Sequence, residues 1–140
     1  ERHPGVADGR LANMPLFAGL SHDQLAEVEA RARAGRFAAG ASIVERWDAT
    51  RDFYVVEEGV VRVVLDGEVV RRLGPGDFFG ELAALDWGAG YGYPRLATVV
   101  AESDVRLLVF SEGTLAELVR TLPSVETRIR AAVQERLAAR

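Results

Sequence analysis

The strongest constraint on the fold is a change of hydrophobic period between Phe37 and Phe110. Over this stretch, apolar and polar residues alternate in short valine-rich runs, and Gly, Pro and Asp stand between the runs at turn positions. These runs predict β-strands at 41–45, 53–57, 59–65, 68–73, 96–101 and 105–110. Because most of the strands have no helix between them, the pattern favours an antiparallel barrel or jelly roll over a parallel sheet.

Two details of this region fix strand pairing and orientation. Asp66-Gly67 lies between two valine-rich runs, and a Gly at that place tolerates the positive φ of a type I′ turn, so it predicts a hairpin. In the last strand, Val105, Leu107 and Val109 alternate and therefore share one face.

A helix precedes the β region. Ser21 and Gln24 have the spacing of a capping box, which predicts a helix from about residue 22 to residue 34. Its apolar positions form one stripe, consisting of Leu25, Val28 and Ala32. Gly35 is predicted to end this helix.

Two helices are predicted after the β region. Ser111 caps a helix over 112–121, and Pro123 ends it because proline lacks the helical N–H. The last helix carries an apolar stripe made of Val125, Ile129, Ala132, Val133 and Leu137. This stripe is consistent with a helix that packs on the barrel, with a paired interface, or with a mobile lid.

Composition excludes several kinds of chemistry. The chain has 140 residues, enough for one domain, and all 17 of its Lys and Arg residues are Arg, which excludes a phosphate-loop NTPase and a Schiff-base enzyme. It has no Cys, and its two histidines, His3 and His22, are too few for a His-rich metal centre. We therefore expect no metal site. Neither a membrane span nor a signal peptide is evident, and residues 1–10 look like a linker left on an excised domain.

The segment that carries functional information begins at Gly80. Gly80-Glu81-Leu82-Ala83 can form a helical turn whose first N–H groups lack partners and attract an anion, and Arg95 follows on the next strand. One guanidinium with these amides suits a singly charged phosphodiester, and ionised Glu81 can accept hydrogen bonds from a sugar hydroxyl. The alternative is structural: Glu81 caps the turn, and Arg95 pairs with Glu81 or Asp77.

With these motifs, the chain resembles the cyclic nucleotide-binding domain family. The resemblance covers most of the sequence and is carried by residues 15–25, 37–44, 54–61, 74–81 and the two closing helices. It implies a mainly β fold, an antiparallel β jelly roll with an N-terminal helix and two C-terminal helices. The domain would span 11–140, with an N-terminal helical part at 11–36, the β-roll at 37–110 and the C-terminal helices at 111–140.

The resemblance also implies roles for individual residues. A phosphate-binding cassette would consist of Gly80, Glu81, Leu82, Ala83, Arg95, Leu96 and Ala97. Arg95 would bind the cyclic phosphate, Glu81 the ribose 2′-hydroxyl, and backbone N–H groups near Ala83 and Ala97 would add phosphate contacts. From strand parity, Val63 and Val70 are expected to face the base. Candidates for a lid over the base are Trp87 and Tyr91, in the glycine-rich stretch 86–93, and Ile129 of the last helix; alternatively, 86–93 is a solvent loop.

The function that the resemblance implies is that of a regulatory sensor that binds cAMP or cGMP, is not an enzyme and needs no cofactor. Leu96 stands where a hydroxyl residue commonly contacts guanine, so cAMP is favoured. The signal would pass through movement of the C-terminal helices to an effector domain outside this chain, and the last helix could form a homodimer. The net charge of −4 and scattered arginines argue against nucleic-acid contact. We expect this segment to make no membrane contact and to lie in the cytoplasm, either by itself or as the cytoplasmic domain of a larger, membrane-bound protein. The alternative is a degenerate fold that acts as a ligand-free protein-interaction module.

Overall fold

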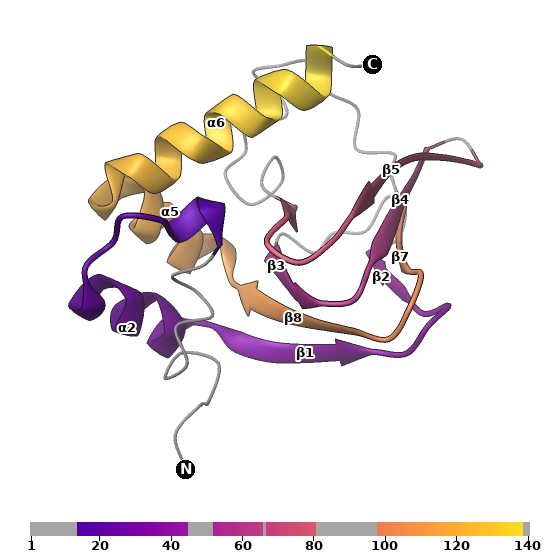
Figure 1. The fold of residues 1–140 in the computed structure, drawn as a ribbon, viewed down its shortest axis with the longest axis horizontal. Helices are drawn as coiled ribbons and strands as arrows, with labels where there is room; N and C mark the ends of the chain where they lie inside the picture. Colours follow the sequence, from indigo (N-terminus) through magenta and orange to yellow (C-terminus); the bar gives the residue numbers. More distant parts are fainter. Residues whose placement is uncertain (1–13, 45–51, 66, 81–97, 139–140) are drawn as a thin grey trace.

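The computed structural model describes residues 14–44, 52–65, 67–80 and 98–138. Figure 1 shows helices gathered at one end of a β-roll, with the long C-terminal helix lying across them. The elements are the 3-10 helix η2 (Pro15–Phe17), α2 (His22–Arg31), β1 (Arg33–Phe37), β2 (Ser42–Val44), β3 (Phe53–Glu58), β4 (Val61–Leu65), β5 (Glu68–Leu73), β6 (Phe78–Phe79), β7 (Thr98–Ala101), β8 (Val105–Phe110), α5 (Glu112–Thr121) and α6 (Pro123–Ala138).

The described strands form two antiparallel sheets of four strands each. The order is β1-β8-β3-β6 in one sheet, called here the inner sheet, and β2-β7-β4-β5 in the other, the outer sheet. The connections from β1 to β2, β3 to β4, β5 to β6 and β7 to β8 each pass from one sheet to the other, as in a jelly roll. The jelly-roll fold with flanking helices predicted from the sequence is therefore confirmed.

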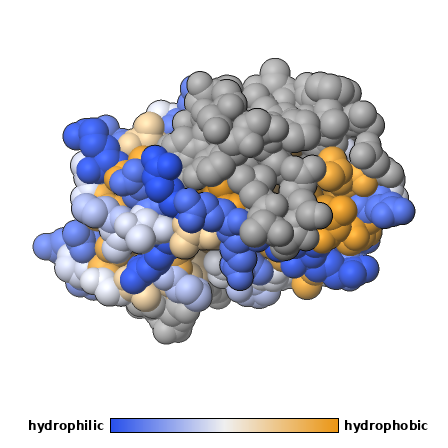
Figure 2. Space-filling model, turned by 90° about the horizontal axis from the view of Figure 1, so that it is seen from above, coloured by the Kyte–Doolittle hydropathy of each residue, from blue (hydrophilic) through white to orange (hydrophobic). Residues whose placement is uncertain are grey.

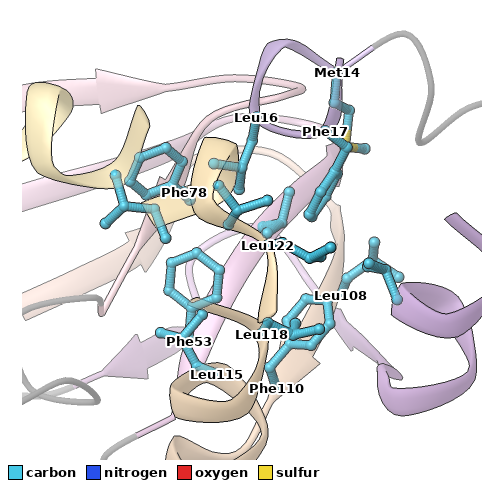
Figure 3. Close-up of a cluster of buried hydrophobic side chains, with 14 of the residues drawn as sticks. Met14, Leu16, Phe17, Phe53, Phe78, Leu108, Phe110, Leu115, Leu118 and Leu122 are labelled. Carbon is cyan, nitrogen blue, oxygen red and sulfur yellow. The ribbon is translucent and has the colours of Figure 1, made fainter. Parts of the chain in front are cut away.

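The inner sheet is buried on both faces because alternate residues of each strand enter different hydrophobic clusters. On β3, Phe53 and Val55 belong to a cluster shared with the helices, whereas Tyr54 and Val56 belong to a cluster between the two sheets. The helix-side cluster consists of Met14, Leu16, Phe17, Val28, Phe53, Val55, Phe78, Leu108, Phe110, Leu115, Leu118, Leu122, Val125, Ile129 and Val133 (Figure 3). The prediction that Val105, Leu107 and Val109 share a face is confirmed, since all three lie in the inter-sheet cluster.

The helix ends agree with the sequence signals in most places. Ser21 and Gln24 make both hydrogen bonds of the capping box, and Ser111 accepts a hydrogen bond from the Thr114 N–H at the start of α5. The α5 helix ends at Thr121, and Pro123 is the first residue of α6. The apolar stripe of α6 packs on the helix-side cluster through Val125, Ile129, Ala132 and Val133.

The predicted helix over 22–34 is too long. It ends at Arg31, and Arg33–Phe37 forms strand β1 instead, which pairs along its whole length with β8. Gly35 was expected to stop the helix, but it lies in the middle of this strand. A Cβ at Gly35 would lie 3.1 Å from Cγ2 of Val109, so the small residue allows close packing beside β8.

The predicted strands are confirmed with small shifts in their ends, while the predicted strand residues 45, 96 and 97 lie outside the described residues. The strand expected at 59–65 starts at Val61, because Gly59, with φ of 90°, belongs to the turn before it. The hairpin at residues 66 and 67 is confirmed: Leu65 pairs with Glu68, and Gly67 has φ of 82°. Strand β6 was not predicted, and its two residues are too few to show a period.

The turns at one end of the roll are hydrogen-bonded to each other, and we call this end the closed end. The Val60 N–H donates to Oγ of Ser103 at 3.1 Å, and the Glu102 N–H donates to the Val60 carbonyl at 2.9 Å. A Cβ on Gly59 would lie 2.3 Å from the Asp104 carbonyl oxygen, so only glycine fits there. The end of β6 and the start of β7 lie at the opposite end, which we call the cassette end.

Candidate functional site

Topology places the residues that flank the predicted cassette at the cassette end of the roll. Strand β6 pairs with the beginning of β3 and ends at Phe79, in the inner sheet, while β7 begins at Thr98 in the outer sheet. The chain between them passes from one sheet to the other. Of the cassette residues, only Gly80 is described; Glu81, Leu82, Ala83, Arg95, Leu96 and Ala97, and the lid candidates Trp87 and Tyr91, lie outside the described residues.

Gly80 has a geometry that no other residue could adopt without strain. Its φ is 89°, in the left-handed region, and a Cβ at this position would lie 2.4 Å from the Asp52 carbonyl oxygen. That distance is much shorter than a van der Waals contact, and the atom that the Cβ would contact belongs to the backbone. The chain therefore passes β3 closely as it enters the segment predicted to bind an anion.

The turn before Gly80 is held against β3. The Gly76 N–H donates to the Val56 carbonyl, and the Val56 N–H donates to the Asp77 carbonyl, both at 2.8 Å. The Asp77 carboxylate accepts a hydrogen bond from the Gly74 N–H at 2.9 Å. Asp77 thus stabilises the turn of the Gly-Pro-Gly-Asp motif and fixes where β6, and hence Gly80, begins.

Aromatic packing fixes the same part of the inner sheet. Tyr54 and Phe79 are cross-strand partners, and their rings stack with centroids 4.7 Å apart and planes 11° from parallel. Both side chains are buried in the inter-sheet cluster. Gly80 follows directly, and a Cβ added to it would lie 3.4 Å from Cδ1 of Tyr54. The rigid aromatic pair therefore supports the entry to the cassette.

The two predicted base contacts occupy different environments. Val63 packs on the inter-sheet cluster and is partly buried. Val70 is 53% exposed, because the β4–β5 register shifts at a bulge: Val63 pairs with Arg71 and Val64 pairs with Val69, which leaves Val70 as the extra residue. The sequence prediction assumed regular alternation along β5 and therefore selected Val70. Because of the bulge, the residue opposite Val63 is Arg71 instead.

The surface near this hairpin is apolar. Among the described residues, Val69 and Val70 are the large hydrophobic side chains that are exposed, at 42% and 53%. Figure 2 shows hydrophobic residues gathered at the end of the molecule that the β4–β5 hairpin occupies in Figure 1. Both valines would lose exposed apolar area if a ligand or a segment covered this end.

The third lid candidate, Ile129, is held in the core. It is fully buried in the helix-side cluster. The helix α6 that carries it is also fixed to η2: Nη1 of Arg128 donates to the Ala18 carbonyl at 2.6 Å and to the Leu16 carbonyl at 3.2 Å. In this conformation Ile129 contributes to core packing.

Neither a metal site nor a membrane-spanning helix is found among the described residues. In that part of the chain, no group of three or more His, Asp or Glu side chains could hold a metal ion. No described helix has the length and apolarity required to cross a membrane. Sequence reasoning missed the structural roles of Asp77 and Arg128. It also missed the bulge that places Arg71 opposite Val63, for which the valine run gives no signal.

Comparison with known proteins agrees with this arrangement. Residues 34–121 match the family described as the cyclic nucleotide-binding domain. A Pycsar effector protein of Xanthomonas perforans is 33% identical over 102 residues, which are 73% of this chain and 32% of that protein. The chain spans about a third of the length of the curated relatives it matches.

Solved structures share the fold. The catabolite activator protein of Thermus thermophilus superposes with a TM-score of 0.74 and 30% identity, covering 89% of this chain and 59% of that one. The regulatory domain of Toxoplasma gondii PKA, solved with cAMP, gives a TM-score of 0.75 and 25% identity, covering 91% of this chain and 48% of that one. Since the family match also extends over more than half of the sequence, the chain belongs to the cyclic nucleotide-binding domain family.

Proposed function

We propose that this chain is a non-catalytic sensor domain that binds a cyclic nucleotide at the cassette end of the roll and signals to an effector domain outside the chain. The observation that carries the proposal is the geometry of Gly80. Its left-handed backbone and close approach to Asp52 allow only glycine at the entry to 81–97. Family membership and the cAMP in the Toxoplasma gondii structure support the same ligand class.

In the proposed site, each cassette residue has a role suited to its chemistry. The Arg95 guanidinium binds the cyclic phosphate in a bidentate manner, and backbone N–H groups near Ala83 and Ala97 add hydrogen bonds. The Glu81 carboxylate accepts a hydrogen bond from the ribose 2′-hydroxyl. Leu96 offers no hydroxyl to guanine, which favours cAMP over cGMP.

The proposed relay uses the C-terminal helices. A ligand can shift a conformational equilibrium only if it binds one state better than the other. In the present conformation the apolar stripe of α6 is buried against the helix-side cluster, and Pro123 separates α6 from α5. Movement about Pro123 would bring α6, and with it Ile129, toward the bound base.

Isothermal titration calorimetry with cAMP and cGMP tests this proposal. Removing one member of a buried charge pair costs about 2–5 kcal/mol, so Arg95→Ala is expected to weaken binding by roughly 30-fold to several thousand-fold. Arg120→Ala is the matched control, because Arg120 pairs with Glu117 on the exposed face of α5 and its loss should leave affinity unchanged. Unchanged affinity in Arg95→Ala would remove this residue from the site.

The titration of the wild-type chain also distinguishes the proposed function from the alternative one. If the wild-type chain binds no cyclic nucleotide, the ligand-free interaction module is the better description. For the relay, amide hydrogen exchange over 112–138 should differ between the free and the cyclic-nucleotide-bound chain. Identical exchange in the two states would contradict movement of α6.

A further inference from the structure

The outward face of the outer sheet carries valines where water would favour polar side chains. On β4 and β7, Val63 and Val99 face the inter-sheet cluster, so the next residues, Val64 and Val100, point outward. Val69 of β5 is the cross-strand partner of Val64 and therefore shares this outward face. An antiparallel sheet with one face in water usually alternates apolar and polar residues. The outward face of this sheet departs from that pattern.

The β-bulge in β5 adds a fourth valine beside this face. Val70 is the extra residue of the bulge, and it directly follows Val69, which pairs with Val64. A bulge changes the direction of the side chains next to it, and both Val69 and Val70 are exposed. Figure 2 shows hydrophobic surface at the end of the molecule that the β4–β5 hairpin occupies in Figure 1. We call Val64, Val69, Val70 and Val100 the valine face.

A positively charged border lies beside the valine face. Arg62 and Arg72 are cross-strand partners on the same outward face, two and three residues along the strands from Val64 and Val69. Nε of Arg72 lies 2.8 Å from Oε1 of Glu102, and Nη1 of Arg62 lies 4.0 Å from the same oxygen. Because two guanidinium groups share one carboxylate, this network keeps a net positive charge, although the whole chain has a net charge of −4.

Charge and area together indicate what covers the valine face. A second copy of the chain would bring another positive border against the first, and like charges oppose such a contact. The two exposed valines also offer far less area than the roughly 800 Å² per partner of a standard stable interface. A small contact is well populated when both sides belong to one polypeptide, because their effective concentration is then high. The chain spans about a third of the length of its curated relatives, so a partner in the same polypeptide is consistent with their size.

We propose that the valine face docks an amphipathic helix of the effector domain, with an aliphatic stripe that covers the valines and acidic side chains along one flank. This inference rests on the part of the proposed function that places an effector domain outside the chain. The acidic flank lies against the border formed by Arg62 and Arg72. A helix suits this surface better than an added strand, because the bulge disrupts the regular hydrogen-bonding edge of β5 that a strand would need.

Cysteine reactivity tests this inference, because the chain has no cysteine of its own. Val70→Cys places a small thiol on the valine face, and mass spectrometry of the labelled peptide follows its alkylation by iodoacetamide. In the whole protein, meaning the chain joined to its effector domain, alkylation should be about tenfold slower than in the isolated chain, as when about nine-tenths of the molecules are docked. Ala34→Cys, at an exposed position of β1, is the control and should react equally fast in both.

Charge reversal tests the chemistry of the partner. In the Val70→Cys background, Arg72→Glu places a carboxylate where the acidic flank would dock, so alkylation in the whole protein should accelerate by about threefold or more. Arg72→Gln only removes the positive charge and should accelerate it less. Arg120→Glu reverses a charge on the exposed face of α5 and should leave the rate unchanged. Thermal melting shows whether each variant is folded.

Each outcome supports or overturns the inference. Equal alkylation of Val70→Cys in the isolated chain and the whole protein would show that nothing covers the face. Slow alkylation that depends on the concentration of the isolated chain would identify a second copy as the occupant, and an unchanged rate in Arg72→Glu would overturn the acidic flank. Titration of the whole protein with cAMP and cGMP separates the two proposals: if neither binds while Val70→Cys stays protected, the proposed ligand fails and the docking surface stands.

Discussion

The two sheets have very different surroundings. On β3 of the inner sheet, Phe53, Val55 and Val56 are at most 1% exposed, because helices cover one face and the outer sheet covers the other. On β5 of the outer sheet, Leu73 is buried, whereas Val69 and Val70 are 42% and 53% exposed. The comparison shows that the inner sheet is buried on two faces, whereas strand β5 of the outer sheet keeps exposed apolar side chains.

The ion pairs of the two sheets differ in the same way. Nε of Arg106 lies 3.0 Å from Oε1 of Glu57 in the inner sheet, where the side chains are 19% and 2% exposed. The outer pair, Arg72 with Glu102, is 60% and 36% exposed. Desolvation makes the inner pair sensitive to loss of one partner, whereas water can replace either partner of the outer pair.

Truncating a core aromatic should have the largest effect on stability. Phe53 is 1% exposed and contacts Phe78 and Phe110, with ring centroids 5.6 and 5.9 Å away. Phe53→Ala is expected to lower the free energy of unfolding by about 3–5 kcal/mol, as measured by urea denaturation. Val69→Ala, on the exposed edge, should change it by less than about 0.5 kcal/mol. Equal losses in both variants would contradict the contrast between the sheets.

Breaking one ion pair in each sheet sharpens the comparison. Arg106→Leu removes the cation next to buried Glu57, so we expect a loss of about 3 kcal/mol in the free energy of unfolding. Arg72→Leu should cost about 0–1 kcal/mol. The double variant Glu57→Leu, Arg106→Leu should recover part of the loss, since it no longer buries a carboxylate that has lost the Arg106 cation. A double variant that is less stable than Arg106→Leu would argue against this account.

Glycine replacements at the ends of the two sheets should give the smallest difference in the free energy of unfolding. Gly80 and Gly67 both have positive φ, but only Gly80 would place a Cβ against backbone, the Asp52 carbonyl. Gly67→Ala should cost about 1–2 kcal/mol for the left-handed conformation alone. Gly80→Ala should cost measurably more in the same denaturation assay, because β3 or the chain after β6 must also move. Equal costs would mean that the contact is easily relaxed.

The sequence predicts most of the fold because its strongest signals are local. Alternating valines, the Asp66-Gly67 turn and the Ser21 capping box each depend on residues close together in the chain. Strand β1 was missed because its formation depends on β8, about seventy residues away. Nothing within Arg33–Phe37 has the valine-rich alternation of the other strands, and Gly35 fits β1 only because of Val109.

The candidate site is predicted less completely for a related reason. Gly80 could be identified from its motif, and the structure adds the physical need for glycine there. The cassette residues from Glu81 to Ala97 stay a prediction, since they lie outside the described residues. Arg71 could not be found from parity, because the β4–β5 bulge changes which side chains face inward, and a bulge depends on the pairing of two strands.

The closed end also has a consequence for how related chains can differ in length. Gly59 lies too close to the Asp104 carbonyl oxygen to carry a Cβ, and the Val60 backbone is hydrogen-bonded to both Glu102 and Ser103. An insertion into either turn would separate these partners, so descendants of this sequence should retain the turns at their present size. At the opposite end, Gly67 has no atom within 4 Å of its would-be Cβ, so extra residues can accumulate there.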